Sequence, residues 1–60
     1  MKTFKCKKRD EKDYQEYKAD SMRIDDAGNL LFRASEDPDE VPRIIGAIPA
    51  GLWMEAFEIL

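Results

Sequence analysis

Residues 22–32 read MRIDDAGNLLF, and this stretch decides the fold. Two apolar runs flank a polar centre, residues 25–29, whose Asp, Gly and Asn tolerate the positive φ angles of tight turns. This pattern predicts a β-hairpin with a loop of about three to five residues. We therefore expect a protein built mainly from antiparallel strands.

On the N-terminal side of this hairpin, residues 2–8 alternate between polar and apolar side chains, with Phe4 and Cys6 in one phase. A period of two predicts a strand. Cys6 is the only cysteine, and a small apolar residue on this strand is the simpler interpretation. The alternative is a reactive thiol whose pKa is lowered by the neighbouring Lys5, Lys7 and Lys8. One unpaired cysteine is typical of a reducing compartment, which predicts the cytoplasm.

Between these two segments, residues 14–24 change their apolar phase near Asp20. A change of phase inside a strand predicts a β-bulge at that point. A helix over residues 10–22 is the competing interpretation, because Lys12 and Glu16 lie four positions apart. The fold would then be α+β.

On the C-terminal side, an acidic loop at residues 35–40 precedes predicted strands at residues 43–48 and 52–60, which are separated by a turn at residues 49–51. Both strands carry apolar side chains for two faces, whereas an antiparallel strand normally buries one. Either the sheet curls into a barrel, or its second face packs on another subunit. We predict one all-β domain over residues 1–60, an antiparallel sheet or half-barrel of four to five strands.

The size of the chain favours a homodimer. For 60 residues, burial contributes on the order of 90 kcal/mol, and ordering the chain costs about the same. A single cysteine and no histidine leave neither a disulfide nor a zinc site to add stability. The residues that we expect in the core or at the dimer contact are Phe4, Ile45, Trp53, Met54, Phe57 and Ile59.

Catalytic and metal-binding patterns are missing from the sequence. The absence of histidine removes Ser–His–Asp and Cys–His arrangements. The acidic turn at residues 25–29 lacks the ligand spacing of a calcium loop. We therefore predict no enzyme, no cofactor and no metal. The nearly uncharged stretch at residues 44–54 is too short to span a bilayer.

Charge is distributed unevenly. Residues 1–12 hold six basic and two acidic side chains, although the chain as a whole has a net charge of −3. A nucleic-acid-binding segment is one hypothesis, and the net negative charge argues against it. Its residues would be Lys5, Lys7, Lys8 and Arg9. The opposite hypothesis is that the acidic remainder imitates a phosphate backbone and occupies a basic groove on another protein. We predict that a protein partner contacts Tyr14, Tyr17, Glu36, Asp37, Asp39, Glu40 and Arg43.

Three motifs carry a resemblance: YKADS at residues 17–21, GNLLF at residues 28–32 and AIPAGLW at residues 47–53. Together they resemble a loose group of small β-rich proteins from phages, prophages and bacteria, over most of residues 14–57. Short phage proteins of this kind are often inhibitors of host enzymes, including anti-CRISPR proteins and inhibitors of the Hachiman or Thoeris defence systems. The resemblance implies an inhibitor that binds a bacterial antiviral defence protein in the host cytoplasm. A nucleic-acid-binding module and a structural accessory subunit remain as alternatives.

Overall fold

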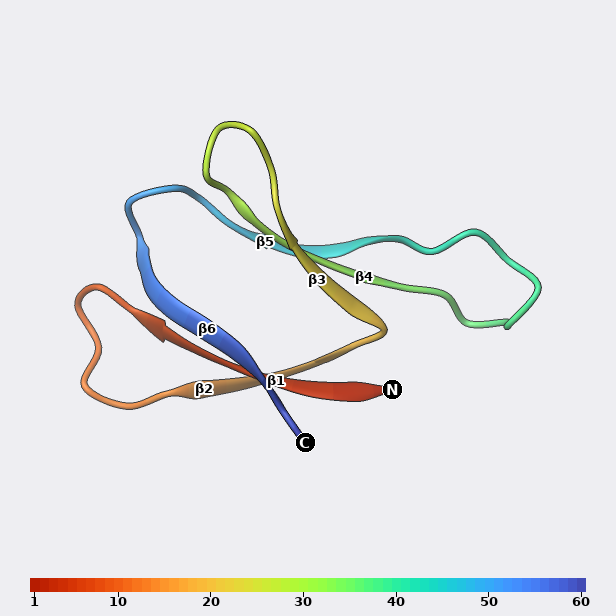
Figure 1. Cartoon of the computed structure of the whole chain (residues 1–60), viewed down its shortest axis with the longest axis horizontal. Coiled ribbons are helices and arrows are strands. Elements are labelled where there is room, and N and C mark those ends of the chain that lie inside the picture. Colours follow the sequence, from red (N-terminus) through yellow and green to blue (C-terminus); the bar gives the residue numbers. More distant parts are fainter.

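Six strands and no helix make up the computed structural model, which describes residues 1–60 (Figure 1). The strands are β1 (Lys2–Lys8), β2 (Gln15–Ala19), β3 (Ser21–Ile24), β4 (Leu30–Ala34), β5 (Arg43–Ile48) and β6 (Trp53–Ile59). The all-β prediction is confirmed. The helix over residues 10–22 does not form, because β2 and β3 occupy its second half. The structure has no helix that is long and apolar enough to cross a membrane.

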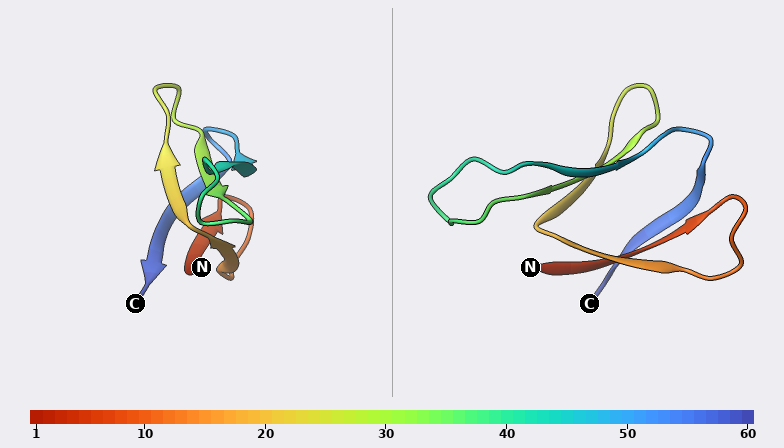
Figure 2. Two further views of the ribbon diagram at one scale, coloured as in Figure 1. Left: turned by 90° about the vertical axis from the view of Figure 1, so that its right-hand side faces the viewer. Right: turned by 180° about the vertical axis from the view of Figure 1, so that it is seen from behind.

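The strands form two antiparallel three-stranded sheets. One sheet has the order β2-β1-β6 and the other has the order β3-β4-β5. The chain passes from the first sheet to the second between β2 and β3, and it returns between β5 and β6 (Figures 1 and 2). Neither β5 nor β6 has a partner on its second edge, so the two sheets remain separate and their outer edges are open.

Asp20 marks the first passage between the sheets. β2 ends at Ala19 and pairs with β1, whereas β3 begins at Ser21 and pairs with β4. The Asp20 backbone N–H donates to the Arg33 carbonyl at 2.8 Å. The change of apolar phase near Asp20 therefore reflects a change of sheet rather than the predicted bulge. This break divides one expected strand into two, and the count is six rather than four to five.

The central hairpin forms as predicted, with Ile24 opposite Leu30. Its turn depends on the Asp25 carboxylate, which accepts hydrogen bonds from the backbone N–H groups of Ala27 (3.0 Å) and Asn29 (2.8 Å). Gly28 has a φ of 88°, a conformation that glycine adopts without strain.

The core lies between the two sheets and contains six buried residues. These are Phe4, Cys6, Ala19, Leu30, Phe32 and Ile48. Phe32 is at its centre, with the Phe4 ring tilted against it at 6.0 Å between centroids and the Tyr17 ring stacked on it at 4.8 Å. The alternation of Phe4 and Cys6 with lysines thus correctly indicated the buried face of β1.

Two polar contacts join the tip of the central hairpin to the turn after β5 and to the first residue of β6. The Trp53 indole N–H donates to the Gly28 carbonyl at 3.0 Å. The Asn29 side-chain oxygen accepts from the Ala50 backbone N–H at 2.8 Å. Both contacts bridge residues more than twenty positions apart, so they tie the return passage of the chain to the second sheet.

The residues expected in the core or at a dimer contact divide into two groups. Phe4 is buried and Trp53 is half-buried against the core cluster. Ile45, Met54, Phe57 and Ile59 are exposed. β5 and β6 therefore leave much of their second apolar face uncovered within one chain.

Candidate functional site

Apart from Tyr17, which packs against the core, the predicted partner-binding residues lie at two opposite ends of the molecule. The loop between β1 and β2, which ends at Tyr14, lies at one end of the long axis (Figure 1). Residues 35–42, which we call the acidic arm, form the β4–β5 loop at the other end (Figures 1 and 2). The molecule extends 37 Å along this axis. One partner surface cannot readily include both ends.

The acidic arm has its own local structure. The Glu40 backbone N–H donates to the Asp37 carbonyl at 3.0 Å, which closes a four-residue turn. Pro38 follows Asp37 in this turn, where its fixed φ favours the turn conformation. The Asp37 carboxylate also accepts from the Asp39 backbone N–H at 3.0 Å. These contacts fix the backbone locally and leave the side chains of residues 36–40 exposed.

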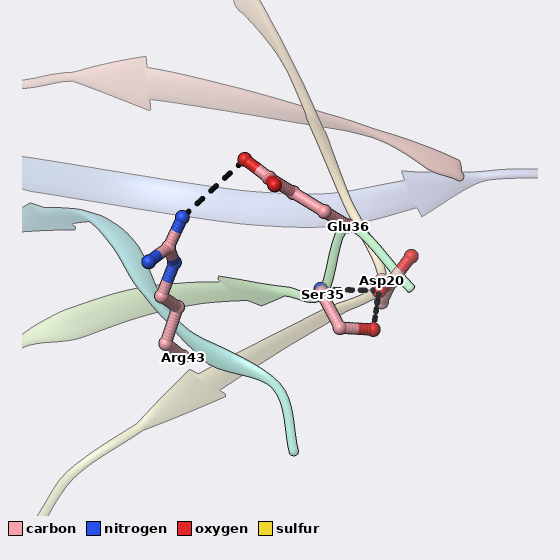
Figure 3. Close-up of polar contacts among 4 residues, drawn as sticks. All are labelled: Asp20, Ser35, Glu36 and Arg43. Atoms are coloured by element: carbon pink, nitrogen blue, oxygen red, sulfur yellow. Dashed lines mark hydrogen bonds and ion pairs between the residues drawn. The ribbon is translucent and has the colours of Figure 1, made fainter. Parts of the chain in front are cut away.

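Asp20 fixes the base of the arm. Its carboxylate accepts hydrogen bonds from the Ser35 backbone N–H at 2.9 Å and from the Ser35 hydroxyl at 3.5 Å (Figure 3). The residue at the break between the two sheets therefore also positions the start of the acidic arm. Asp20 was not among the predicted site residues, and its only signal in the sequence was the change of apolar phase.

Arg43 and Glu36 face each other across the arm. The Arg43 guanidinium lies 3.4 Å from the Glu36 carboxylate (Figure 3). Both side chains are largely exposed, so water and salt screen the pair and it contributes little to stability. Each charge can exchange this contact for one with a partner at little cost.

Exposed apolar side chains continue directly from the acidic arm into β5. Val41 is 88% exposed, and Ile44 and Ile45 are about half exposed. Val41 was not among the predicted partner-binding residues. Its position between the acidic residues 36–40 and Pro42 already indicated that it lies in the loop rather than in a strand. Residues 36–45 therefore combine four carboxylates with three large apolar groups.

The two tyrosines have different environments. Tyr17 is half-buried on Phe32, and its hydroxyl donates to the Gln15 side chain at 2.8 Å. Tyr14 is exposed and packs edge-on against Phe57 of β6, with 5.6 Å between ring centroids. The structure thus places Tyr14 with the exposed side chains of β6 and Tyr17 with the core.

The basic residues of β1 do not form an isolated patch. Lys5 lies opposite Glu16 of β2, and Lys7 lies opposite Glu55 of β6. Residues opposite each other in antiparallel strands place their side chains on the same face. Carboxylates therefore accompany the lysines that the nucleic-acid hypothesis requires, while Lys8 and Arg9 lie at the end of the strand.

Other polar groups serve the fold. Burial raises the pKa of the Cys6 thiol, with a smaller opposing effect from Lys8. Hydrogen bonds from Asn29 lower the pKa of Asp25. The structure has no pocket and no cluster of potential metal ligands. In comparisons with known proteins, no family model, no curated protein and no solved structure matches this chain.

Proposed function

We propose that this chain is a non-enzymatic protein-binding module and that its partner docks on the acidic arm and the start of β5. The observation that carries the proposal is the composition of residues 36–45. Carboxylates and large exposed apolar groups follow one another along the chain there, at one end of the molecule. Contiguous exposed apolar groups beside polar ones are typical of interaction surfaces.

The partner surface would be basic at its rim and apolar at its centre. Carboxylates at residues 36–40 would attract basic side chains from a distance and orient the encounter. Val41, Ile44 and Ile45 would then supply most of the affinity, because their burial removes apolar surface from water. The turn closed by Asp37 reduces the ordering cost, since the backbone is already fixed before binding.

For the identity of the partner, we infer a bacterial antiviral defence protein in the cytoplasm of the host. Support comes from the resemblance to small phage proteins and from the acidic arm. A row of carboxylates on a projecting loop imitates a phosphate backbone and can occupy a basic groove. Blocking such a groove inhibits the target without any catalysis by this chain.

The test compares two charge-neutralised variants of equal size. The arm variant carries Glu36→Gln, Asp37→Asn, Asp39→Asn and Glu40→Gln, which keep the side-chain oxygens that accept hydrogen bonds. The control variant carries Asp10→Asn, Glu11→Gln, Asp13→Asn and Glu16→Gln at the other end of the molecule. Each is used to capture partners from bacterial lysate and to measure affinity for the captured defence protein.

We expect the arm variant to bind at least about tenfold more weakly, with a slower association rate, while the control binds like the wild type. Val41→Ser should weaken binding without changing its salt dependence. Equal effects of both charge variants would contradict the proposal. Capture of nucleic acid alone, with binding that weakens as salt rises, would favour the nucleic-acid hypothesis instead.

A further inference from the structure

The free edge of β6 is long and lacks the lysines and prolines that protect strand edges. β6 pairs with β1 on one side only, and no strand pairs with its other edge. It has seven residues, and its register with β1 is regular from Glu55 to Ile59. Natural proteins protect such edges with lysine, proline, bulges or short strands, because an unprotected edge pairs with another strand.

The other free edges carry these protections. β2 has alternating charges at Glu16 and Lys18, and β3 has only four residues. β5 lies between Pro42 and Pro49 and has a register shift opposite β4. β6 has a register shift opposite Lys7 and Lys8 and carries two glutamates, Glu55 and Glu58, but it contains no lysine and no proline, and its five residues from Glu55 to Ile59 pair regularly with β1.

The side chains beside this edge are also unusually exposed. Met54 is 60% exposed, and in the Tyr14–Phe57 pair the two residues are 40% and 45% exposed. Phe57 lies opposite Lys5 in the register with β1, on the face away from the core. The exposed apolar side chains of Met54, Phe57 and Tyr14 therefore lie on β6 and on the outer face of its sheet.

The whole chain exposes more surface than a folded monomer of its size. Its accessible area is 4542 Å², whereas a 7.0 kDa monomer typically exposes about 4,000 Å². Its radius of gyration is 11.7 Å, against about 10.4 Å for a typical domain of this length. A standard interface removes about 800 Å² from each partner, which is enough to cover this excess.

From these observations we infer that a second copy of this chain pairs with the free edge of β6, antiparallel and about a twofold axis at Phe57. The two sheets β2-β1-β6 would then join into one continuous six-stranded sheet. Registers centred on Glu55 or Glu58 would place like charges directly opposite each other, which is unfavourable. The register centred on Phe57 places this ring opposite its copy and Glu55 opposite Ile59, and it joins both Tyr14–Phe57 pairs into one aromatic cluster.

A second copy is favoured over an unrelated partner because every copy carries both the free edge of β6 and the excess of exposed surface. Two copies can therefore cover each other's edge, and they are always present at equal concentration. A twofold axis also makes the contact self-complementary and closed, so pairing ends at two chains. This inference is independent of the proposed function, because the acidic arm lies at the other end of the second sheet and takes no part in the contact.

The first experiment measures mass by sedimentation of the full chain at about 50 µM, where a dimer of micromolar affinity is well populated. The wild type should sediment at twice 7.0 kDa. Met54→Lys and Ile59→Lys should make the folded monomer the main species at this concentration, with a dissociation constant raised at least about a hundredfold. The matched control is Ile45→Lys on β5, which is comparably exposed and should leave the dimer intact.

The second experiment tests the register. The wild type has one cysteine, Cys6, which is fully buried, so it should not cross-link under mild oxidation. Phe57→Cys should form a disulfide dimer, whereas Ile45→Cys should not. A folded wild-type monomer at this concentration would overturn the inference, and so would loss of the dimer in Ile45→Lys alone. Both results would leave the acidic arm as a binding site for another protein.

Discussion

At the scale of single residues, Asp25 shows how one carboxylate holds a turn. Its pKa is lowered by hydrogen bonds from the Asn29 backbone and side chain, with smaller contributions from Ala27 and Gly28. The folded chain therefore holds this proton less tightly than the unfolded chain, where the pKa is near 3.8. The stability that Asp25 contributes is fully present above this value and is lost as pH falls through the lower folded value.

We expect Asp25→Ala to lower the melting temperature at pH 7 and to differ less from the wild type below about pH 3. Thermal unfolding followed by circular dichroism at several pH values measures this difference. Asp26→Ala is the control, because Asp26 is exposed and does not hold the turn. A difference that stays constant down to about pH 2 would show that ionisation of Asp25 is irrelevant to the turn.

Cys6 gives a second prediction at this scale, because burial raises the pKa of its thiol. The thiolate is the reactive form, and the side chain is fully buried in the core. We expect alkylation of the folded protein at pH 8 to be at least about a hundredfold slower than alkylation in denaturant. Mass spectrometry of timed samples measures both rates. Labelling of the folded protein as fast as that of a free thiol would support the reactive-thiol alternative.

At the scale of elements, the contacts between the central hairpin and the β5–β6 connection can be tested with two glycines. Gly28 and Gly51 have almost the same positive φ, 88° and 87°. A Cβ at Gly28 would lie 3.3 Å from the Ala50 Cβ, whereas a Cβ at Gly51 would meet open space. Gly51→Ala therefore carries the backbone cost alone, and Gly28→Ala carries the same cost together with a steric conflict.

We expect Gly51→Ala to lower the free energy of unfolding by about 1 kcal/mol and Gly28→Ala to lower it by about 2 kcal/mol. Urea denaturation at pH 7 measures both values. Trp53→Phe should lower it by about 1 kcal/mol, because the hydrogen bond to the Gly28 carbonyl is lost. Equal losses for the two glycine variants would indicate that the hairpin tip moves away from Ala50 at no cost.

The same elements show why some features could be predicted and others could not. The central hairpin depends on residues within a few positions of each other, so Asp25, Gly28 and Asn29 were sufficient to predict it. The break at Asp20 depends on β4, because the Asp20 N–H bonds Arg33, thirteen positions away. Local phase therefore located the break but could not distinguish a bulge from a change of sheet.

The candidate site shows the same limit. Tyr14 and Tyr17 are three positions apart, an odd spacing that places them on opposite faces of an extended segment. The strand period of two was therefore sufficient to predict different environments for the two tyrosines, although both were predicted to contact the same partner. The acidic loop could be recognised from composition, whereas the role of Asp20 at its base required the pairing of distant strands.

At the scale of the whole molecule, the distribution of charge follows from the position of β1. The basic N-terminal strand is the central strand of its sheet, between β2 and β6, which both carry carboxylates. Lys2 also lies 3.9 Å from Glu58. The basic N-terminal segment and carboxylates from the acidic remainder of the chain thus lie side by side in one sheet. The four carboxylates of the acidic arm are far from this strand, which leaves them available to a partner.

The thin shape of the molecule leads to a prediction about its thermal stability. The shortest extent of the Cα trace is 14 Å, and only seven of the sixty residues are buried. A second copy on β6 would add burial that one chain lacks, and unfolding would then be coupled to dissociation. Mass action raises the melting temperature of such a dimer by about 6 °C for a tenfold increase in protein concentration, for an unfolding enthalpy of about 0.7 kcal/mol per residue.

Calorimetry of the wild type should show this slope, and Ile45→Lys should keep it. Met54→Lys should lower the melting temperature and abolish the slope, because its folded state is a monomer. A wild-type melting temperature that is independent of concentration would mean that the single chain is stable with the free edge of β6 in water.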